Sequence, residues 1–390
     1  MYLLSTEQLE QLGAEITTRE IKQQPQLWEE TFINYGEIME GITNFLEEIK
    51  QKSKGKVRVI FTGAGTSQYV GDTLVPYLNS HGDHQNYIFE SRGTTDIVSA
   101  PYDYLIADET ILLVSFARSG NSPESVAAIE LTNQLIKSAY HLVITCAPNG
   151  DLAKMAQKDS NSFLFLMPAA SNDQGFAMTG SFTCMTLAGL LIFDQTALEM
   201  KEKYVQTVAA LGKEVIKREA EIQKWLVDDF ERIVYLGSGS LAGLTREAQL
   251  KILELTAGKI ATIYDSSMGF RHGPKSFINN QTLVFGFIQN DSYTQLYDLD
   301  ILNEIENDGI AKKVVGISQK KENRLTAECF ELDTEKITLP EGYLALVYIM
   351  VAQTIALLTS VKVKNTPDRP SATGTVNRVV KGVTIHAYES

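Results

Sequence analysis

The sequence predicts an α/β protein with two doubly wound parallel sheets in tandem, preceded by a helical region and followed by a tail. Short β-branched runs alternate with helical stretches from about residue 56 onward, and this alternation appears twice. The length of 390 residues suffices for two or three domains. With 44% hydrophobic and 21% charged residues, the composition is that of an ordinary folded protein. We therefore expect compact structure along nearly the whole chain.

The first 52 residues carry a helical pattern. The STEQ motif at residues 5–8 has the form of a capping box, which marks a helix start. Leu9, Leu12, Ile16 and Ile21 then continue an apolar stripe at helical spacing. We expect a helical N-terminal region that ends shortly before the first strand.

The strand pattern that follows appears in two copies. The runs of the first copy are VRVIF, YIF, ILLVSF, HLVITC and FLFLM. Three of them have counterparts, RIVYLG, TLVFGF and KKVVGIS, about 170 residues later in each case, which indicates a duplicated domain. Buried strands alternating with helices predict parallel sheets. The predicted boundaries are 1–52 for the helical region, 53–200 and 201–365 for the two domains, and 366–390 for the tail.

Charge and cysteine content limit the partners. The chain has 35 basic and 48 acidic residues, a net charge of −13 at pH 7, which disfavours nucleic acid and anionic membrane surfaces. Cys146, Cys184 and Cys329 form no CxxC pair, which is typical of a reducing compartment and argues against structural zinc. The N-terminus shows no export signal. We expect a cytoplasmic protein without a metal.

One apolar stretch, residues 343–361, approaches the roughly 20 residues that a membrane-spanning helix needs. Gln353 and Thr354 interrupt it, and its flanks show no basic asymmetry. A buried core helix or a subunit-interface helix is the favoured interpretation.

Two turns after predicted strands could bind an anion. The first, GAGTS, contains Gly65, Thr66 and Ser67 between a strand and a helix, where backbone N–H groups can meet a ligand. A dinucleotide fingerprint would need a third glycine where this chain has Gln68, although Glu90 could have bound a ribose. A nicotinamide enzyme is therefore disfavoured.

The second turn, ARSGNSPES at residues 117–125, is richer in donors. It offers Arg118, Ser119, Asn121 and Ser122, the mixture of cation and hydroxyls that a phosphate group needs. An alternative is that Ser122 only caps a helix that begins with proline. Both can hold together, and we expect the two turns to lie at the carboxyl ends of neighbouring strands, where such sheets bind ligands.

The second copy offers two proton-transfer candidates. Glu247 and Glu254 share one face of a predicted helix, and Glu247 can pair with Lys251 one turn on. Glu254 has leucine neighbours, and partly apolar surroundings would suit it to proton abstraction. In the GFRHGPK loop, His272 has cations on both sides and could move protons during sugar ring opening, although a lone loop histidine is more often just solvated.

Five motifs in order, GAGTS, ARSGNS, LKILELTAG, FRHGPK and the terminal RVVKGVTIHAYES, resemble the sugar isomerase (SIS) family in its duplicated, flavodoxin-like form. Within it they are most similar to the galactosamine-6-phosphate deaminase/isomerase branch, formerly described as tagatose-6-phosphate ketose/aldose isomerases. The set is also similar to the isomerase half of glucosamine-6-phosphate synthase. This resemblance implies that Ser67, Ser119 and Ser122 hold a phosphate, that Glu254 moves a proton between C1 and C2, and that His272, from its own or a neighbouring subunit, opens the ring.

The resemblance implies further roles for Lys381, near the open-chain carbonyl, and for Thr179, as a sugar contact. The phosphate turn is longer than that of the synthase, which leaves the donor set open. The chain lacks the glutaminase of the synthase, so release of an amine is expected rather than its installation. The implied function is conversion of galactosamine 6-phosphate to tagatose 6-phosphate and ammonia without a cofactor, in a homodimer or higher homo-oligomer. Alternatives are a plain aldose/ketose phosphosugar isomerase and a non-catalytic sugar-phosphate-binding regulator.

Overall fold

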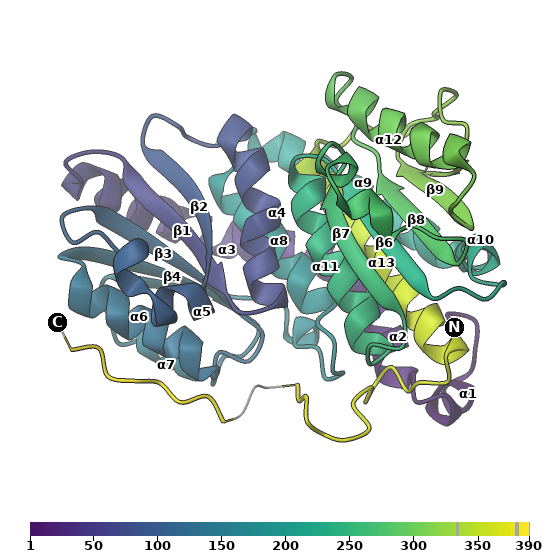
Figure 1. The fold of residues 1–390 in the computed structure, drawn as a ribbon. Coiled ribbons are helices and arrows are strands. Elements are labelled where there is room, and N and C mark those ends of the chain that lie inside the picture. The colour runs from purple at the N-terminus through teal and green to yellow at the C-terminus, as the bar shows by residue number, and fades with distance from the viewer. Residues whose placement is uncertain (333–334, 379–381, 390) are drawn as a thin grey trace. The chain divides into compact units, whose positions relative to one another are not determined.

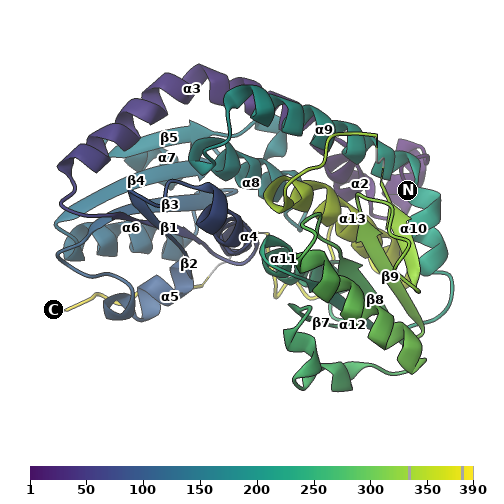
Figure 2. The same ribbon diagram turned by 90° about the horizontal axis from the view of Figure 1, so that it is seen from above.

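The computed structural model describes the chain except for residues 333–334, 379–381 and 390. The chain divides into two compact units. We call residues 27–173, 180–197 and 374–390 the first-half unit, and residues 1–26, 174–179 and 198–373 the second-half unit. Each unit holds a five-stranded parallel sheet with helices against its faces (Figures 1 and 2). The predicted fold class, two doubly wound α/β sheets in one chain, is confirmed.

The sheet of the first-half unit has the strand order β2-β1-β3-β4-β5, and all neighbouring strands are parallel. The predicted β-branched runs form these strands because both faces of the sheet are covered by helices. The strands are β1 (Val57–Gly63), β2 (Tyr87–Gly93), β3 (Thr110–Ala117), β4 (Ser138–Thr145) and β5 (Ser162–Leu166). The helices are α3 (Gln24–Lys52, in this unit from Leu27), α4 (Thr66–His81), α5 (Thr94–Ser99), α6 (Pro123–Leu135), α7 (Asp151–Ala156) and α8 (Gly180–Phe193).

The second-half unit repeats this topology, with the strand order β10-β9-β8-β6-β7. Its strands are β6 (Arg232–Gly237), β7 (Ala261–Ser266), β8 (Thr282–Phe287), β9 (Lys313–Ser318) and β10 (Glu328–Glu331). Its helices are α1 (Thr6–Gln11), α2 (Glu15–Lys22), α9 (Leu198–Lys217), α10 (Glu219–Trp225), α11 (Ser240–Leu255), α12 (Thr294–Asp308) and α13 (Glu341–Lys362). The predicted capping box is present at the start of α1, where Ser5 and Gln8 exchange hydrogen bonds.

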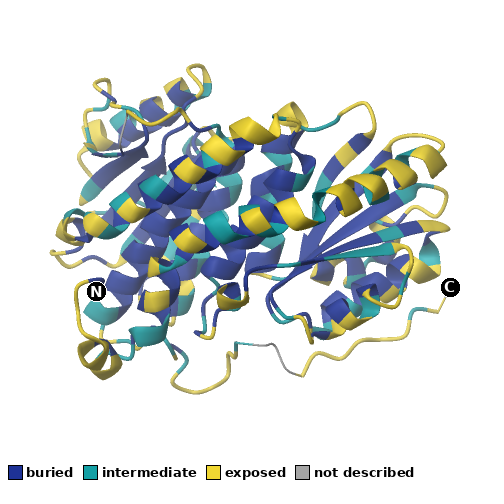
Figure 3. Cartoon of the chain, turned by 180° about the vertical axis from the view of Figure 1, so that it is seen from behind, coloured by how far each residue is buried: buried dark blue, intermediate teal, exposed yellow. Residues whose placement is uncertain are grey.

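Helix α13 is the core helix of the second-half unit. Every residue from Gly342 to Ser360 is buried, and the helix packs against α11, α9 and α10. Its length and composition would also fit a membrane span, but 89% of its apolar window is buried inside the protein. Figure 3 shows buried residues concentrated in the strands and the inner helices. The interpretation of this stretch as a core helix is therefore confirmed.

The order of the strands determines where a ligand crevice forms. In the first sheet the chain passes from β1 to β2 on one side and then to β3 on the other. The crevice of a doubly wound sheet lies at such a switch point, beyond the carboxyl ends of the strands. The GAGTS turn follows β1 and the ARSGNS turn follows β3. The topology thus brings the two predicted phosphate turns to adjacent strand ends within the first-half unit.

Candidate active site

The first glycine turn joins β1 to helix α4. Gly65 is its N-cap and has a φ of +57°, which favours glycine. A Cβ atom at Gly63 would lie 2.6 Å from the Cβ of Ser67, so the close strand-to-helix passage also requires glycine there. Thr66 and Ser67 begin the helix and are 4% and 6% exposed. Two hydroxyl side chains are therefore placed at a helix N-terminus, where partial positive charge favours an anion.

The second turn joins β3 to helix α6. Ser122 occupies the N-cap position before Pro123, yet within the described residues its side chain makes no capping hydrogen bond to the helix. Capping alone therefore does not account for this serine. Gly120, with a φ of +66°, lets the backbone turn sharply between Ser119 and Ser122. The turn presents hydroxyls next to a second helix N-terminus.

The side-chain oxygen of Asn121 is bonded within the protein. Its Oδ1 accepts a hydrogen bond of 2.9 Å from the backbone N–H of Asp151, at the start of α7. The Oγ of Ser119 accepts a long hydrogen bond, 3.4 Å, from the N–H of Asn121. The oxygen of the Asn121 side chain thus ties the turn to the neighbouring loop.

Arg118 connects the turn to the C-terminal tail. It is 7% exposed, and its Nη2 donates a hydrogen bond of 2.6 Å to the carbonyl oxygen of Arg378. The guanidinium of Arg378 in turn donates to the carbonyl oxygen of Asp173 at 2.8 Å and to Oδ1 of Asn172 at 2.9 Å. Arg378 could not be singled out from the sequence, because a basic residue in a polar tail has no distinguishing pattern. Lys381, three residues further on, lies outside the described residues.

Helix α11 carries a buried ion triad, which we define as Glu247, Lys251 and Glu254. The Nζ of Lys251 lies 3.1 Å from Oε1 of Glu247 and 2.6 Å from Oε2 of Glu254. The side chains of Glu247 and Lys251 are fully buried, and that of Glu254 is 22% exposed. Burial alone lowers the pKa of Lys251, but the two carboxylates together outweigh burial and raise it above its usual value. Lys251 therefore stays charged and holds Glu254 in place.

The predicted pair of Glu247 with Lys251 is confirmed, and Lys251 is also part of the surroundings of Glu254. Leu255 next to Glu254 is fully buried and Leu253 is exposed, while the ammonium group of Lys251 contacts the carboxylate directly. The carboxylate of Glu254 is thus fixed by an ion pair on its own helix. The spacing of three residues between Lys251 and Glu254 allows this second ion pair on the same helix.

His272 lies in an exposed loop of the second-half unit. Two short 3-10 turns, Gly269–Arg271 and Pro274–Phe277, flank it. Gly273 between them has a φ of +126°, which only glycine adopts readily. The imidazole is thus presented at the surface of this unit.

The glycine turn of the second-half unit joins β6 to α11, and side chains of the same unit form hydrogen bonds with it. Asp298, 1% exposed, accepts hydrogen bonds from the hydroxyls of Ser238 at 2.6 Å and Ser267 at 2.5 Å, and from the N–H of Gln289 at 3.1 Å. Burial raises the pKa of Asp298 to about 6. The Gln289 side chain, which follows β8 as Arg118 follows β3, donates to the carbonyl oxygen of Ser238 at 2.8 Å. A carboxyl group and an amide therefore stand where the first-half unit has a guanidinium and hydroxyls.

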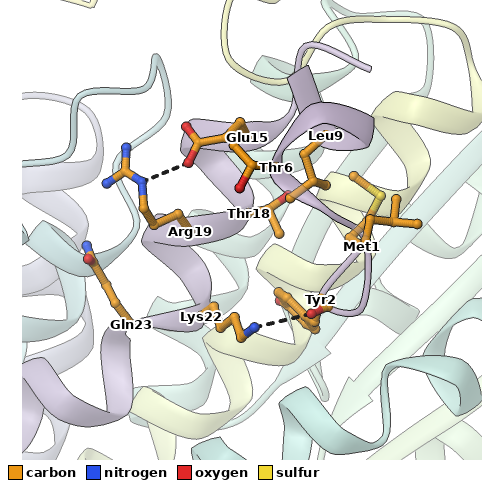
Figure 4. A pocket seen from close by; sticks show the side chains of 10 residues that line it. Met1, Tyr2, Thr6, Leu9, Glu15, Thr18, Arg19, Lys22 and Gln23 are labelled. Carbon is orange, nitrogen blue, oxygen red and sulfur yellow. Dashed lines mark hydrogen bonds and ion pairs between the residues drawn. The ribbon is translucent and has the colours of Figure 1, made fainter. Parts of the chain in front are cut away.

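The remaining predicted contact, Thr179, is fully buried directly before α8. A separate pocket of about 310 Å³ lies among the N-terminal helices of the second-half unit (Figure 4). Arg19 pairs with Glu15 at 3.0 Å there, and Lys22 donates to the carbonyl oxygen of Tyr2 at 3.2 Å. None of the predicted site residues lines it. In the part of the chain that the structure describes, no group of three or more His, Cys, Asp or Glu residues could hold a metal ion.

The duplicated doubly wound fold, with hydroxyl-rich turns at the switch point of its first sheet, defines the class of this protein. The chain belongs to the SIS domain family, which matches residues 53–194 and 228–362. The family resemblance found in the sequence is confirmed.

Relatives of known name cover nearly the whole chain. It is 42% identical over 380 residues to the D-galactosamine-6-phosphate deaminase AgaS of Escherichia coli, with 96% of each protein covered. It is 40% identical to the protein of the same name from a Shewanella species, with 99% of this chain and 95% of the relative covered. Among solved structures, the tagatose-6-phosphate ketose/aldose isomerase from Escherichia coli superposes with a TM-score of 0.87 at 39% identity, with 96% of this chain and 97% of that one covered.

The glucosamine-6-phosphate deaminase of Thermotoga maritima has the same fold. It superposes with a TM-score of 0.68 at 18% identity, with 93% of this chain and 99% of that chain covered.

The ion triad predicts a large stability effect at Lys251. The Lys251→Met variant should lower the free energy of unfolding by about 3–5 kcal/mol, because it leaves buried carboxylate charge without its ammonium partner. Urea unfolding followed by circular dichroism measures this. Lys224→Met, which changes an exposed lysine on α10, is the matched control and should differ from the parent by less than about 0.5 kcal/mol. Equal losses in the two variants would contradict the assigned importance of the triad.

Proposed function

We propose that this protein is a galactosamine-6-phosphate deaminase/isomerase, which converts galactosamine 6-phosphate and water to tagatose 6-phosphate and ammonia. The observation that carries the proposal is the setting of Glu254, whose carboxylate is held by fully buried Lys251 while part of its side chain remains exposed. A base for carbon-bound protons needs this combination of fixed position and access. The full-length relatives named for this deaminase activity support the choice of substrate.

The phosphate group is assigned to the two turns of the first-half unit. Ser67, Ser119 and Ser122 are the hydroxyl donors, and Arg118 supplies positive charge beside them. Hydroxyls, backbone N–H groups and a guanidinium together satisfy phosphate oxygens, and helix N-termini favour the charge. Gly65 and Thr66 shape the first turn, Asn121 fixes the second, and Thr179 is proposed as a sugar contact.

The sugar head is assigned to residues of the second-half unit and the tail. His272 assists ring opening by moving a proton between O5 and O1, which gives the open-chain aldehyde. Glu254 removes the proton from C2 and returns it to C1. Lys381 is proposed to lie near the carbonyl oxygen at C1 and to stabilise the charge that develops there.

The amine leaves by hydrolysis. Transfer of the C2 proton to C1, together with movement of one amine proton to O1, reduces the aldehyde carbon to an alcohol and oxidises the carbon that carries nitrogen, so a C2 imine forms. Water then adds to this imine, the C–N bond breaks, and ammonia leaves with a ketone at C2. Oxidation and reduction balance within the substrate, so the reaction needs no redox cofactor.

The proposed setting is cytoplasmic, and the proposed assembly is a homo-oligomer in which His272 serves its own or a neighbouring subunit. Apolar side chains support an interface, because Leu253, Tyr264 and Met268 are 41–47% exposed on α11, β7 and the loop that follows. Sedimentation equilibrium at micromolar concentration should give at least two chains per particle. A monomer under those conditions would contradict the proposed assembly.

The Glu254→Gln variant should lose about 10²–10⁴-fold in kcat for ammonia release from galactosamine 6-phosphate, because the amide cannot accept the C2 proton. Enzymatic detection of ammonia in single-substrate assays measures this. The near-identical shape of glutamine keeps the helix folded, which circular dichroism checks.

The Ser122→Ala variant is the comparison. It should raise KM by about tenfold with little change in kcat, because a phosphate hydrogen bond is the same in ground and transition states.

Isomerisation of an aldose phosphate that carries no amine would favour the plain isomerase. Tight binding without turnover in the parent protein would favour a regulator.

A further inference from the structure

The two cationic side chains beside His272, Arg271 and Lys275, form ion pairs with carboxylates on helix α12. The Nε of Arg271 lies 2.7 Å from Oε2 of Glu304. Lys275 forms ion pairs with the same Glu304 and with Asp308, in the second case at 2.6 Å. Arg271 and Lys275 thus converge on one carboxylate from opposite sides of His272. We call this arrangement, in which Arg271 and Lys275 both pair with Glu304, the clamp.

Aromatic side chains anchor the loop at both ends, and within it the backbone N–H of His272 donates to the carbonyl oxygen of Gly269 at 2.9 Å. Phe270 is fully buried in the core cluster of the second-half unit, and Phe277 packs against that cluster. Between them His272 is exposed, and Gly273 adopts a conformation that a glycine reaches with little restraint. The exposed imidazole projects from this backbone, so contacts of the residues on either side of it add to what orients it.

We propose that Glu304 is a positioning residue for His272, which it fixes through Arg271 and Lys275. The inference rests on the proposed role of His272 in ring opening and adds a residue that neither the motif nor the mechanism includes. Arg271 and Lys275 are neutralised by Glu304 and Asp308, so they are not assigned to the substrate phosphate.

The strength of this clamp comes from its connectivity. The side chains of Arg271 and Lys275 are 27% exposed and that of Glu304 is 37% exposed, so water weakens each ion pair. An isolated pair at such a position contributes little, whereas several charges in one network contribute more. Removing Glu304 removes the partner that both cations share. Loss of precise placement near a reacting group reduces turnover more than it reduces substrate binding.

The Glu304→Gln variant tests this in the full-length protein. We expect kcat for ammonia release to fall about fivefold, the loss that a network of this exposure supports, with KM within about twofold of the parent. Glu306→Gln is the matched control, because it removes an exposed glutamate two residues along the same helix. It should leave both constants unchanged. Equal rates in Glu304→Gln and Glu306→Gln would overturn the proposal.

A double-mutant cycle separates positioning from general stability. If Glu304 acts through His272, the Glu304→Gln change should have no further effect in a His272→Asn background. A fivefold loss that persists in that background would overturn the positioning role. A parent-like rate in His272→Asn would contradict the ring-opening role in the proposed function and this inference with it.

A measurement without turnover keeps the two proposals distinguishable. The chain has five histidines, so ¹³C labelling at the histidine Cε1 position gives few signals, and His272→Asn assigns the one of interest. We expect Glu304→Gln to narrow and shift the His272 signal, as a loop residue gains mobility, while Glu306→Gln leaves it unchanged. An unaltered His272 signal in Glu304→Gln would overturn the clamp, whatever the substrate proves to be.

Discussion

The ammonium group of Lys251 lies between two carboxylates on helix α11, and the chemistry proposed for this protein depends on that contact. Placing a lysine in the core is unfavourable unless partners compensate, and here Glu247 and Glu254 lie within 3.1 and 2.6 Å of it. The buried partner, Glu247, fixes the lysine from one side. The partly exposed partner, Glu254, is thereby held at a defined place with a surface that a substrate can reach. The buried ammonium group of Lys251 thus makes Glu254 a candidate catalytic residue on the surface of helix α11.

Duplication gave the chain two similar sheets, but their turns have diverged in charge. In the first-half unit Arg118 and Ser122 flank the switch point, which suits an anion. In the second-half unit Asp298 accepts hydrogen bonds from the hydroxyl of Ser238 and the backbone N–H of Gln289, and the side chain of Gln289 donates to the carbonyl oxygen of Ser238. A carboxyl group that already occupies these donors leaves no equivalent place for a phosphate. This difference supports the assignment of the phosphate to the turns of the first-half unit.

Local sequence patterns predicted all five strands of the first sheet and the three central strands of the second, and they failed at the two edge strands of the second sheet. Strands β7 and β10 are half-exposed and contain Asp265 and Glu331, so neither reads as an apolar run. For the site, helical spacing predicted the pair of Glu247 with Lys251. The contacts of Asp298 and Glu304 could not be predicted in this way, because α12 meets the turn and the loop only after the chain has folded. Contacts between residues of one helix can be predicted from their spacing in the sequence, whereas contacts between elements that are distant in the sequence cannot.

The most direct test of the account is a crystal structure of the Glu254→Gln variant with galactosamine 6-phosphate bound. The account predicts the phosphorus atom at the turns that contain Ser67 and Ser122, with C1 and C2 of the sugar within hydrogen-bonding distance of the side chain at position 254. Phosphate at the turn beside Asp298, or a sugar head remote from position 254, would contradict it.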